Sequence, residues 1–600
     1  MTMETVQFQF LTGLTRPIFR NARLRGSWDG NGRYSDHWME TPMHEELGED
    51  GCPAFTASIG LDLADRDKTF KWGVILDGPQ GSNFWGIPTE LNDVNSAERY
   101  RRFRLDQTVN SHSIERYFFT YGRYLGANKH FDGESPTPGL RFAVWAPNAQ
   151  EIEVVFGDAG AYIADDGAGI DATQPAVSLS RPNGDGIWHG DAPASFETFR
   201  SRPYMYRIKN AQGRTVYRTD IFSRGQAGRG AVDPSDAAWT GSVDTLDGTV
   251  SCSVVIDPDV VRRGFASTPA GEPPDLIPAD EFWASEFTAG VSVPSRLEDL
   301  VIYELHVGSL GFGKDGPGTL SDALAFLDHL IELGVNAVEL LPMAEFHGNV
   351  NWGYGDTHHF CIESSAGGRD KYRHFVRACH QRGIAVIQDV VYNHYDFHAG
   401  RAEWQYDSET PEENIYYWYE RHSSDYDTPD GGYLDNNSSG STPRFWEEVV
   451  RQQFISSAAF LVEEMHVDGL RVDLTQAIHR DNTLHADGRS IGNANIFGQK
   501  FLREWSRTLH MIRPTVMLIA EDHTGWDAVT KLPAQGGLGF DSTWEAAFYH
   551  NLVGDSDQAG GRARLLKQAG YGGDGKRKRD GGEGEREERK ERRGGGKEEK

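Results

Sequence analysis

The chain has 600 residues, of which 38% are hydrophobic and 11% aromatic, enough for several packed cores in roughly two to four domains. Its formal net charge of −29 argues against a nucleic-acid-binding protein, which needs basic surface to displace counterions, and gives little attraction to an anionic membrane. We therefore expect neither nucleic acid nor a membrane as a partner, whereas a neutral ligand is compatible with this charge.

The cysteines and the amino terminus indicate the compartment. Cys52, Cys252, Cys361 and Cys379 are scattered without metal-type spacing, so neither a disulfide framework nor a zinc site is predicted. The amino terminus, "MTMETVQFQFLTGLTRPIFR", lacks a basic region followed by an apolar run and a cleavage site, and no later segment is long and apolar enough to span a bilayer. We expect a cytoplasmic protein that needs no cofactor.

Two β-rich segments come first. Residues 1–108 contain short strands separated by turn clusters, such as "AFTASIGL" and "TFKWGVILDG", which predict a β-sandwich. Residues 109–295 repeat the pattern, with "GLRFAVWAPNAQEIEVVFG" at 139–157 as the clearest stretch. The sequence therefore predicts two β-sandwich domains, the first of which is a candidate carbohydrate-binding module.

Aromatic residues in the first domain suggest a sugar-binding surface. The stretch "RGSWDGNGRYSDHW" places Trp28, Tyr34 and Trp38 among short polar turns. Aromatic faces beside hydrogen-bonding groups suit sugar rings, which have apolar faces and hydroxyl edges. These three residues are candidate carbohydrate ligands, and packing in the core of the sandwich is an equally good interpretation.

From about Leu300 the rhythm changes to strand, helix, strand, helix. Apolar runs such as "LVIYELHVG", "VNAVELLPM" and "IAVIQDVVYNH" alternate with the amphipathic segments "LSDALAFLDHLIELG" and "DKYRHFVRACHQRG". This pattern is typical of a parallel sheet with helical crossovers, which commonly closes into a barrel. We expect a barrel over residues 296–571. A tail of only glycine and charged residues, 572–600, is predicted to be disordered.

An insertion is predicted inside the barrel. Asp389 and Asp473 are 84 positions apart, more than one crossover helix needs, so a sub-domain is expected at about 394–445. Its segments "NIYYWYE" and "GGYLDNNSSG" are candidates to line a cleft, although ordinary core packing is the better interpretation of Tyr416, Tyr417, Trp418 and Tyr419.

Three successive strands of the predicted barrel end in charged residues. They supply Asp389, then Arg471 with Asp473, then Glu521. A lone Arg-x-Asp pair has a structural explanation as a buried salt bridge, but the carboxyl ends of barrel strands converge on the active site. If the last two of these strands are neighbours, about 4.8 Å apart, Asp473 and Glu521 lie near the roughly 5 Å separation of retaining glycosidases.

The same residues suggest a division of labour. A neighbouring guanidinium favours an ionised carboxylate, so Arg471 is expected to keep Asp473 charged as a nucleophile. Glu521 follows the apolar run "VMLIA" and lies near an anion, so its pKa is expected to rise, which suits a general acid.

These motifs resemble a known family. "DVVYNH", "GLRVDLTQAIH" and "LIAED" are similar to the first three signature regions of the α-amylase superfamily of retaining α-glucan enzymes, over roughly residues 300–555. The stretch at 139–157 resembles the amino-terminal β-sandwich of branching enzymes, isoamylases and trehalohydrolases. The resemblance implies an α-glucan substrate, with Asp473 as nucleophile, Glu521 as acid/base and Arg471 as the partner of the nucleophile.

The resemblance also implies substrate-binding residues. Asp389 and His394 match the first region, which provides structural support and contacts with sugar hydroxyls, and Tyr354 in "NWGYGDTHHF" matches an aromatic residue that stacks on the sugar. A role of Asn393 in calcium support is only weakly indicated. His358 and His359 are better explained as a solvated or structural pair than as metal ligands, and the chemistry requires no metal.

One signature is not found. The superfamily's fourth region, a His-Asp pair after the seventh strand, supplies a third carboxylate, and the last recognisable strand is "GLGFD", residues 537–541, which resembles the sixth. The resemblance therefore implies a barrel that is incomplete at its carboxyl-terminal end, with exposed sheet edges, low solubility and little catalytic activity.

Several functions remain open. The leading interpretation is a 1,4-α-glucan branching enzyme, followed by maltooligosyl-trehalose trehalohydrolase and α-amylase, which share the glycosyl-enzyme step and differ in the acceptor or the product. From a different class, a non-catalytic glucan-binding protein also fits two β-domains ahead of an incomplete barrel.

Overall fold

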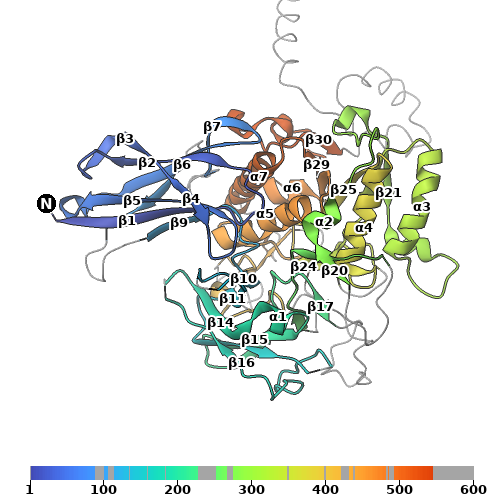
Figure 1. Ribbon diagram of the computed structural model, residues 1–600, viewed down its shortest axis with the longest axis horizontal. Helices are drawn as coiled ribbons and strands as arrows, with labels where there is room; N and C mark the ends of the chain where they lie inside the picture. Colours follow the sequence, from blue (N-terminus) through green and yellow to red (C-terminus); the bar gives the residue numbers. More distant parts are fainter. Residues whose placement is uncertain are drawn as a thin grey trace, which may run out of the picture.

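The structure is a computed structural model (Figure 1). It describes residues 2–87, 100–105, 114–133, 135–158, 160–182, 184–227, 252–265, 275–346, 351–396, 401–420, 432–436, 440–480, 484–485 and 492–544. The predicted tail, 572–600, lies outside the described residues. Among the described helices, none has both the length and the apolar character needed to cross a membrane.

The first module is a two-sheet β-sandwich, seen at the left of Figure 1. One sheet has the order β4-β5-β1-β9 and the other β3-β2-β6-β7, with β8 added to β6. The strands are β1 (Met3–Leu11), β2 (Arg20–Trp28), β3 (Tyr34–Pro42), β4 (His44–Leu47), β5 (Pro53–Asp62), β6 (Phe70–Gly78), β7 (Gly81–Trp85), β8 (Arg101–Phe103) and β9 (Ile114–Phe118). Because β9 pairs in parallel with β1, this module extends beyond the predicted boundary at residue 108.

Alternating side chains of the first module form its core. Val6, Phe8 and Phe10 project from the same face of β1 and are completely buried. The intervening residues Gln7 and Gln9 lie on the other face and remain half-buried. This alternation with a period of two is typical of a strand that buries one of its faces.

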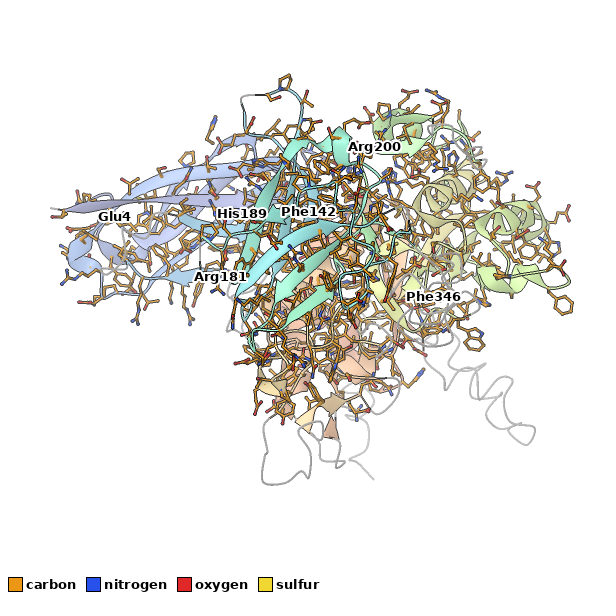
Figure 2. All side chains as sticks on the ribbon, turned by 90° about the horizontal axis from the view of Figure 1, so that it is seen from below. Glu4, Phe142, Arg181, His189, Arg200 and Phe346 are labelled. Carbon is orange, nitrogen blue, oxygen red and sulfur yellow. The ribbon has the colours of Figure 1, made fainter. Side chains whose placement is uncertain are left out.

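The second module is also a β-sandwich, and it faces the viewer in Figure 2. Its sheets have the orders β10-β11-β14 and β13-β12-β15-β18-β17, with β16 added to β15. The strands are β10 (Gly126–His130), β11 (Gly139–Trp145), β12 (Glu151–Phe156), β13 (Val177–Ser178), β14 (Ile187–Ser195), β15 (Pro203–Lys209), β16 (Thr215–Arg218), β17 (Gln226–Ala227) and β18 (Cys252–Val254), and α1 (Phe196–Phe199) follows β14. The hairpin β19 (Val260–Arg262) and β20 (Leu276–Pro278) and helix α2 (Ala279–Trp283) lead into the third module.

The third module is built on a six-stranded parallel sheet with the order β21-β22-β25-β27-β29-β30. Its strands are β21 (Ile302–Leu305), β22 (Ala337–Leu340), β25 (Ala385–Val390), β27 (Gly469–Val472), β29 (Met517–Glu521) and β30 (Ser542–Trp544). The helices are α3 (Leu320–Glu332), α4 (Gly368–Gln381), α5 (Glu448–Glu463), α6 (Thr475–His479) and α7 (Gly492–Ile512). The described part thus has the strand order of a barrel's first six strands.

The sixth strand begins later than predicted. Residues 537–541 were expected to form it, but β30 starts at Ser542. Gly536 and Gly539 adopt left-handed backbone conformations, with φ of 82° and 84°, which a strand does not accept. Leu538 and Phe540 are buried in the core, so their apolar character reflects a packed loop.

The inserted segment contains a buried aromatic cluster. Short antiparallel pairings hold it together, including β26 (Leu434–Asp435) with β28 (Leu484–His485), and the hairpin β23 (Ala344–Phe346) and β24 (Asp356–Ile362) lies after β22. Tyr416, Tyr417 and Trp418 are at most 3% exposed, so core packing is confirmed for them and the hypothesis that they line a cleft is wrong. Part of "GGYLDNNSSG", residues 431 and 437–439, lies outside the described residues.

Glu464, directly after α5, connects the barrel to the second module and to the segment that joins the two sandwiches. Its carboxylate accepts a hydrogen bond of 2.7 Å from Arg224 Nη2 of the second module. Arg123 Nη2, from the segment that joins the two sandwiches, lies 3.3 Å away, and Arg373 Nη2 of α4 lies 3.7 Å away. One largely buried carboxylate therefore links the barrel helices to the second module and to the segment between the two sandwiches.

Candidate active site

The inner face of the parallel sheet changes from apolar to charged along the strands. Near the amino-terminal ends, Ala337, Ala385, Ile387, Met517 and Ile519 form one buried cluster. Two residues further along β22, β25 and β29, on the same face, stand Glu339, Asp389 and Glu521. The strand ends thus bring the predicted charged residues together.

Arg471 joins the three predicted carboxylates. Its Nη1 donates to both oxygens of Asp389 at 2.9 and 2.7 Å and to Asp473 Oδ1 at 3.0 Å. Its Nη2 lies 2.9 Å from Glu521 Oε2. The Arg471 residue is only 6% exposed, so this guanidinium is confined between carboxylates that come from three neighbouring strands.

The strands that carry Asp473 and Glu521 are neighbours. Val472 pairs with Ala520 in the parallel ladder. Asp473 directly follows Val472 and Glu521 directly follows Ala520, so the two acids lie side by side on adjacent strands. Both carboxyl groups contact the same Arg471 guanidinium, at 3.0 and 2.9 Å. The neighbour relation assumed in the argument for a retaining geometry is therefore confirmed, and the roles of the two acids stay a prediction.

The residue after Asp473, Leu474, has a strained backbone and donates a hydrogen bond to Glu521. Leu474 has φ of 43° and ψ of 50°, a left-handed conformation that costs a side-chain-bearing residue about 1–3 kcal/mol. Its backbone N–H donates to Glu521 Oε2 at 2.9 Å. The turn ends the strand after Val472 and points a backbone donor at the second acid, which the alternating pattern of the sequence did not indicate.

The order of the two pKa values differs from the prediction. Burial and the charge of Asp389 raise the pKa of Asp473 to about 7, despite the opposing effect of Arg471. Burial also acts to raise the pKa of Glu521, but His523, Arg471 and the Leu474 N–H outweigh it and bring that pKa to about 2. The expectation that Arg471 keeps Asp473 charged while Glu521 stays protonated is therefore wrong for the ligand-free protein. Arg471 divides its charge among three carboxylates, and Glu521 gains donors that Asp473 lacks.

Tyr354 and Asp389 are in direct contact at the edge of this cluster. The Tyr354 hydroxyl donates to Asp389 Oδ2 at 2.8 Å. Burial raises the pKa of Asp389 to about 6, although the Arg471 guanidinium and the Tyr354 hydroxyl oppose the effect. The sequence resemblance assigned Tyr354 to sugar stacking, and in the structure its hydroxyl also fixes the buried acid.

His394 reaches the cluster through its neighbour. The ring Nδ1 of His394 lies 2.8 Å from Asn393 Oδ1, and Asn393 Nδ2 donates to Asp473 Oδ2 at 2.8 Å. Burial lowers the pKa of His394 to about 4, so the imidazole is neutral near pH 7. Asn393, which was considered only for calcium support, is a direct partner of the predicted nucleophile.

Glu339 is a charged residue that the sequence reasoning missed. It stands on β22 in the apolar run "VNAVELLPM", is 1% exposed, and its Oε2 has no hydrogen-bond partner among the described residues. Burial and the charge of Asp389 raise its pKa well above the usual value. A glutamate inside a continuous apolar strand was the signal that could have revealed it.

The aromatic residues predicted to bind sugar in the first module serve mainly as packing groups. Trp28 is completely buried and stacks on Phe8, with ring centroids 5.2 Å apart, so its assignment as a sugar ligand is wrong. Tyr34 is half-buried, with its ring edge against Phe70 and its hydroxyl donating to Asp36. Trp38 is also half-buried and packs against Trp85 and Tyr100.

The two adjacent histidines lie inside the protein. His358 and His359 are at most 3% exposed, and burial lowers the pKa of each to about 3. His358 Nε2 lies 3.0 Å from Thr219 Oγ1 of the second module. Within the described ranges no group of three or more His, Cys, Asp or Glu side chains has an arrangement suited to a metal ion.

Two families match this architecture. Residues 311–571 match the α-amylase catalytic domain, and residues 124–223 match carbohydrate-binding module 48, the isoamylase amino-terminal domain. The predicted resemblance to the α-amylase superfamily is confirmed by the match over residues 311–571. An enzyme domain of the glycoside hydrolase and transferase type thus follows a carbohydrate-binding module of a known family.

Named relatives narrow the comparison. The chain is 29% identical over 445 residues to the 1,4-α-glucan branching enzyme GlgB of Oleidesulfovibrio alaskensis, covering 72% of this chain and 59% of that enzyme. It is 28% identical over 555 residues to GlgB of Methylococcus capsulatus, covering 87% and 64%. The chain thus spans about 60% of the length of these curated relatives. Among solved structures, a putative α-amylase from Salmonella typhimurium has 19% identity and a TM-score of 0.47, covering 74% of this chain and 59% of that one.

Proposed function

We propose that this chain acts on α-glucan by a retaining mechanism, and that it transfers the cleaved segment to a second glucan, as a 1,4-α-glucan branching enzyme does. The observation that carries the proposal is the contact of one buried guanidinium, Arg471, with Asp389, Asp473 and Glu521. The similarity to curated branching enzymes supports a glucan hydroxyl as the acceptor in preference to water.

The pair of acids holds one proton below about pH 7. With pKa values of about 7 for Asp473 and about 2 for Glu521, the proton resides on Asp473 below pH 7. Catalysis requires the opposite arrangement, because the nucleophile must be ionised and the acid protonated. Arg471 contacts both carboxyl groups and stabilises a negative charge on either one, which supports transfer of the proton from Asp473 to Glu521.

The reaction has two steps, in which the glycosyl-enzyme first forms and is then transferred to the acceptor. The Asp473 carboxylate attacks the anomeric carbon, the bond to the leaving glucan oxygen breaks, and Glu521 gives that oxygen its proton. In the second step a hydroxyl of another glucan loses its proton to Glu521 and attacks the glycosyl-enzyme, which releases Asp473. Tyr354, His394 and Asp389 form the proposed substrate-binding group beside the reacting carbon.

Turnover is expected to be slow. Losing one preorganised charge-stabilising group commonly lowers the rate by roughly 10² to 10³. The third carboxylate of the superfamily is not found among the described barrel strands, and residues 545–571, which the family model also matches, lie outside the described residues. We therefore propose assays at high protein concentration and long incubation.

The test is the formation of α-1,6 branches in amylose. After incubation the glucan is treated with a debranching enzyme, and its chain-length profile and new reducing ends are measured. We expect branches from the unaltered chain, few new reducing ends, and no branches from Asp473→Asn, since a neutral amide cannot attack the anomeric carbon. Asp328→Asn, which changes an exposed acid on α3, is the matched control and should branch normally.

Two outcomes would contradict the proposal. Equal branching by the unaltered chain and Asp473→Asn would show that this acid is not the nucleophile. New reducing ends without branches would assign water as the acceptor, as in α-amylase.

A further inference from the structure

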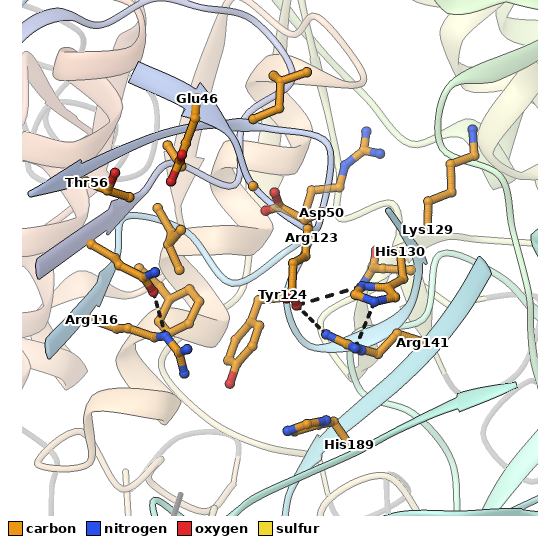
Figure 3. Close-up of a pocket in the computed structure, with 18 of the residues that line it drawn as sticks. Glu46, Asp50, Thr56, Arg116, Arg123, Tyr124, Lys129, His130, Arg141 and His189 are labelled. Atoms are coloured by element: carbon orange, nitrogen blue, oxygen red, sulfur yellow. Dashed lines mark hydrogen bonds and ion pairs between the residues drawn. The ribbon is translucent and has the colours of Figure 1, made fainter. Parts of the chain in front are cut away.

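A cavity of about 570 Å³ lies between the two β-modules (Figure 3). The first sandwich contributes residues of β1, β4, β5 and β9, and the module-48 sandwich contributes residues of β10, β11 and β14. Ligand sites commonly occupy clefts of about 300–1,000 Å³ at domain interfaces. None of the residues lining the cavity belongs to the barrel sheet, so this is a place distinct from the Arg471 cluster.

The centre of the cavity presents an amphipathic aromatic surface. Tyr124 is half-buried and stacks on Phe118, with ring centroids 4.0 Å apart. Figure 3 shows its ring in the middle of the cavity, and its hydroxyl has no hydrogen-bond partner among the described residues. Leu47, at 73% exposure, adds apolar surface to the lining. A flat apolar face with a free hydroxyl suits the face and the edge of a sugar ring.

Fixed polar groups surround the aromatic surface. Arg141 Nη1 bonds to Glu49 Oε2 of the first module at 2.6 Å, and its Nη2 lies 2.9 Å from His130 Nε2 (Figure 3). On the opposite side, Arg116 is exposed and donates from Nε to Gln9 Oε1 at 2.7 Å, and its two terminal amino groups have no hydrogen-bond partner within the described part of the chain. The result is a set of planar donors and acceptors held in place by the contact of two modules.

The charge balance favours a neutral ligand over an anion. Three of the four lysine and arginine side chains that line the cavity are paired with carboxylates, Arg116 being the exception. Arg141 pairs with Asp191 at 2.7 Å and Lys129 with Asp257 at 2.8 Å. Arg123 likewise pairs with Asp259 at 2.9 Å. A phosphate would need free cations in excess, whereas a polyhydroxylated sugar needs only oriented donors and acceptors.

We infer that this inter-module cavity is a second α-glucan-binding site, which holds a short segment of α-1,4-linked glucose away from the reacting carbon. The choice of α-glucan rests on the proposed function. Tyr124 forms the stacking surface, while Arg116 and the Glu49–Arg141 pair bind hydroxyl groups. A glucan bound here is retained on the protein between catalytic events, so the site raises the local concentration of substrate.

The test measures maltoheptaose binding by calorimetry in the full chain carrying Asp473→Asn, which prevents turnover. We expect two classes of binding site. Adding Tyr124→Leu or Arg116→Gln should weaken one class about tenfold and leave the other unchanged. Arg200→Gln, which changes an arginine of the same module outside the cavity, is the matched control and should leave both classes unchanged. Thermal unfolding and circular dichroism establish that each variant is folded.

Three results would overturn the inference. One is unchanged maltoheptaose affinity in both folded cavity variants, and another is a loss of affinity in the control as well. The third is calorimetric binding of inorganic phosphate in place of maltoheptaose. The experiment measures only binding, so absence of branching activity would refute the proposed function without affecting this test. Failure to bind maltoheptaose in the cavity would likewise leave the proposed function untouched.

Discussion

Replacing Glu464 by glutamine should weaken the junction between the barrel and the second module. In the folded protein burial acts to raise the pKa of Glu464, but Arg224, Arg123 and Arg373 outweigh it and lower the pKa from 4.5 to about 2. One pKa unit corresponds to about 1.4 kcal/mol. The ionised carboxylate is therefore stabilised in the folded state by about 3 kcal/mol, close to the cost of about 3–5 kcal/mol for breaking a buried ion pair.

The sign of the pH dependence follows from the direction of the change. Because the folded pKa lies below the unfolded one, this stabilisation is present above pH 4.5 and is lost as the pH falls toward about 2. The free energy of unfolding of Glu464→Gln should be about 3 kcal/mol lower than that of the unaltered protein at pH 7. The difference should narrow below pH 4.5, where the unfolded chain takes up the proton.

The assay is urea unfolding followed by tryptophan fluorescence, at pH 7 and at pH 3. Glu332→Gln, a change of the exposed glutamate at the end of α3, is the control and should shift stability by less than about 0.5 kcal/mol. A loss below about 1 kcal/mol for Glu464→Gln at pH 7 would refute the reasoning. So would a loss of the same size at both pH values.

Three further predictions concern the pair of acids in the candidate active site and the core of the first sandwich. Above pH 7, Asp473→Asn should have a higher free energy of unfolding than the unaltered protein, as measured by urea titration. The folded pKa of Asp473, about 7, exceeds the unfolded value of 3.8, so burying the ionised acid becomes costly as the pH rises. A lower stability of the variant at pH 8 would contradict this. Branching activity should fall as the pH rises through about 7, where the proton shared with Glu521 is lost; a pH–rate profile that stays flat to pH 9 would argue against a shared proton. Gly26→Ala should destabilise the first sandwich by about 1–3 kcal/mol, since the added Cβ would lie 1.9 Å from Trp28 Cη2; an unchanged thermal midpoint would show that the Trp28 ring moves easily.

The sequence predicted the parallel sheet well, because buried strands and amphipathic helices leave periodic signals that depend only on local residues. The helices expected at 320–334 and 370–383 appear as α3 (Leu320–Glu332) and α4 (Gly368–Gln381). The sixth strand was misplaced by its apolar residues. Leu538 and Phe540 are buried by tertiary packing around glycine turns, and a one-dimensional pattern does not separate such a loop from a strand.

The sequence predicted which residues form the candidate site, but it did not predict the order of their pKa values. Strand ends identified Asp389, Arg471, Asp473 and Glu521, since parallel strands bring their carboxyl ends together. The order of the pKa values depends on which oxygen receives which donor, and the Leu474 N–H that favours ionised Glu521 arises from a left-handed turn. Trp28 was misjudged for a related reason, because a glycine two residues earlier makes room for its ring inside the core.

The parallel pairing of β1 with β9 has a consequence for the order of events during synthesis. Residues 7–11 at the beginning of the first module contact residues 114–118 at its end, so the sheet lacks its last strand until more than a hundred residues have been translated. At roughly 5–20 residues per second this takes on the order of 5–20 s. During that interval β1 presents an unpaired edge at which other nascent chains can aggregate. The rate of translation determines how long this edge stays exposed.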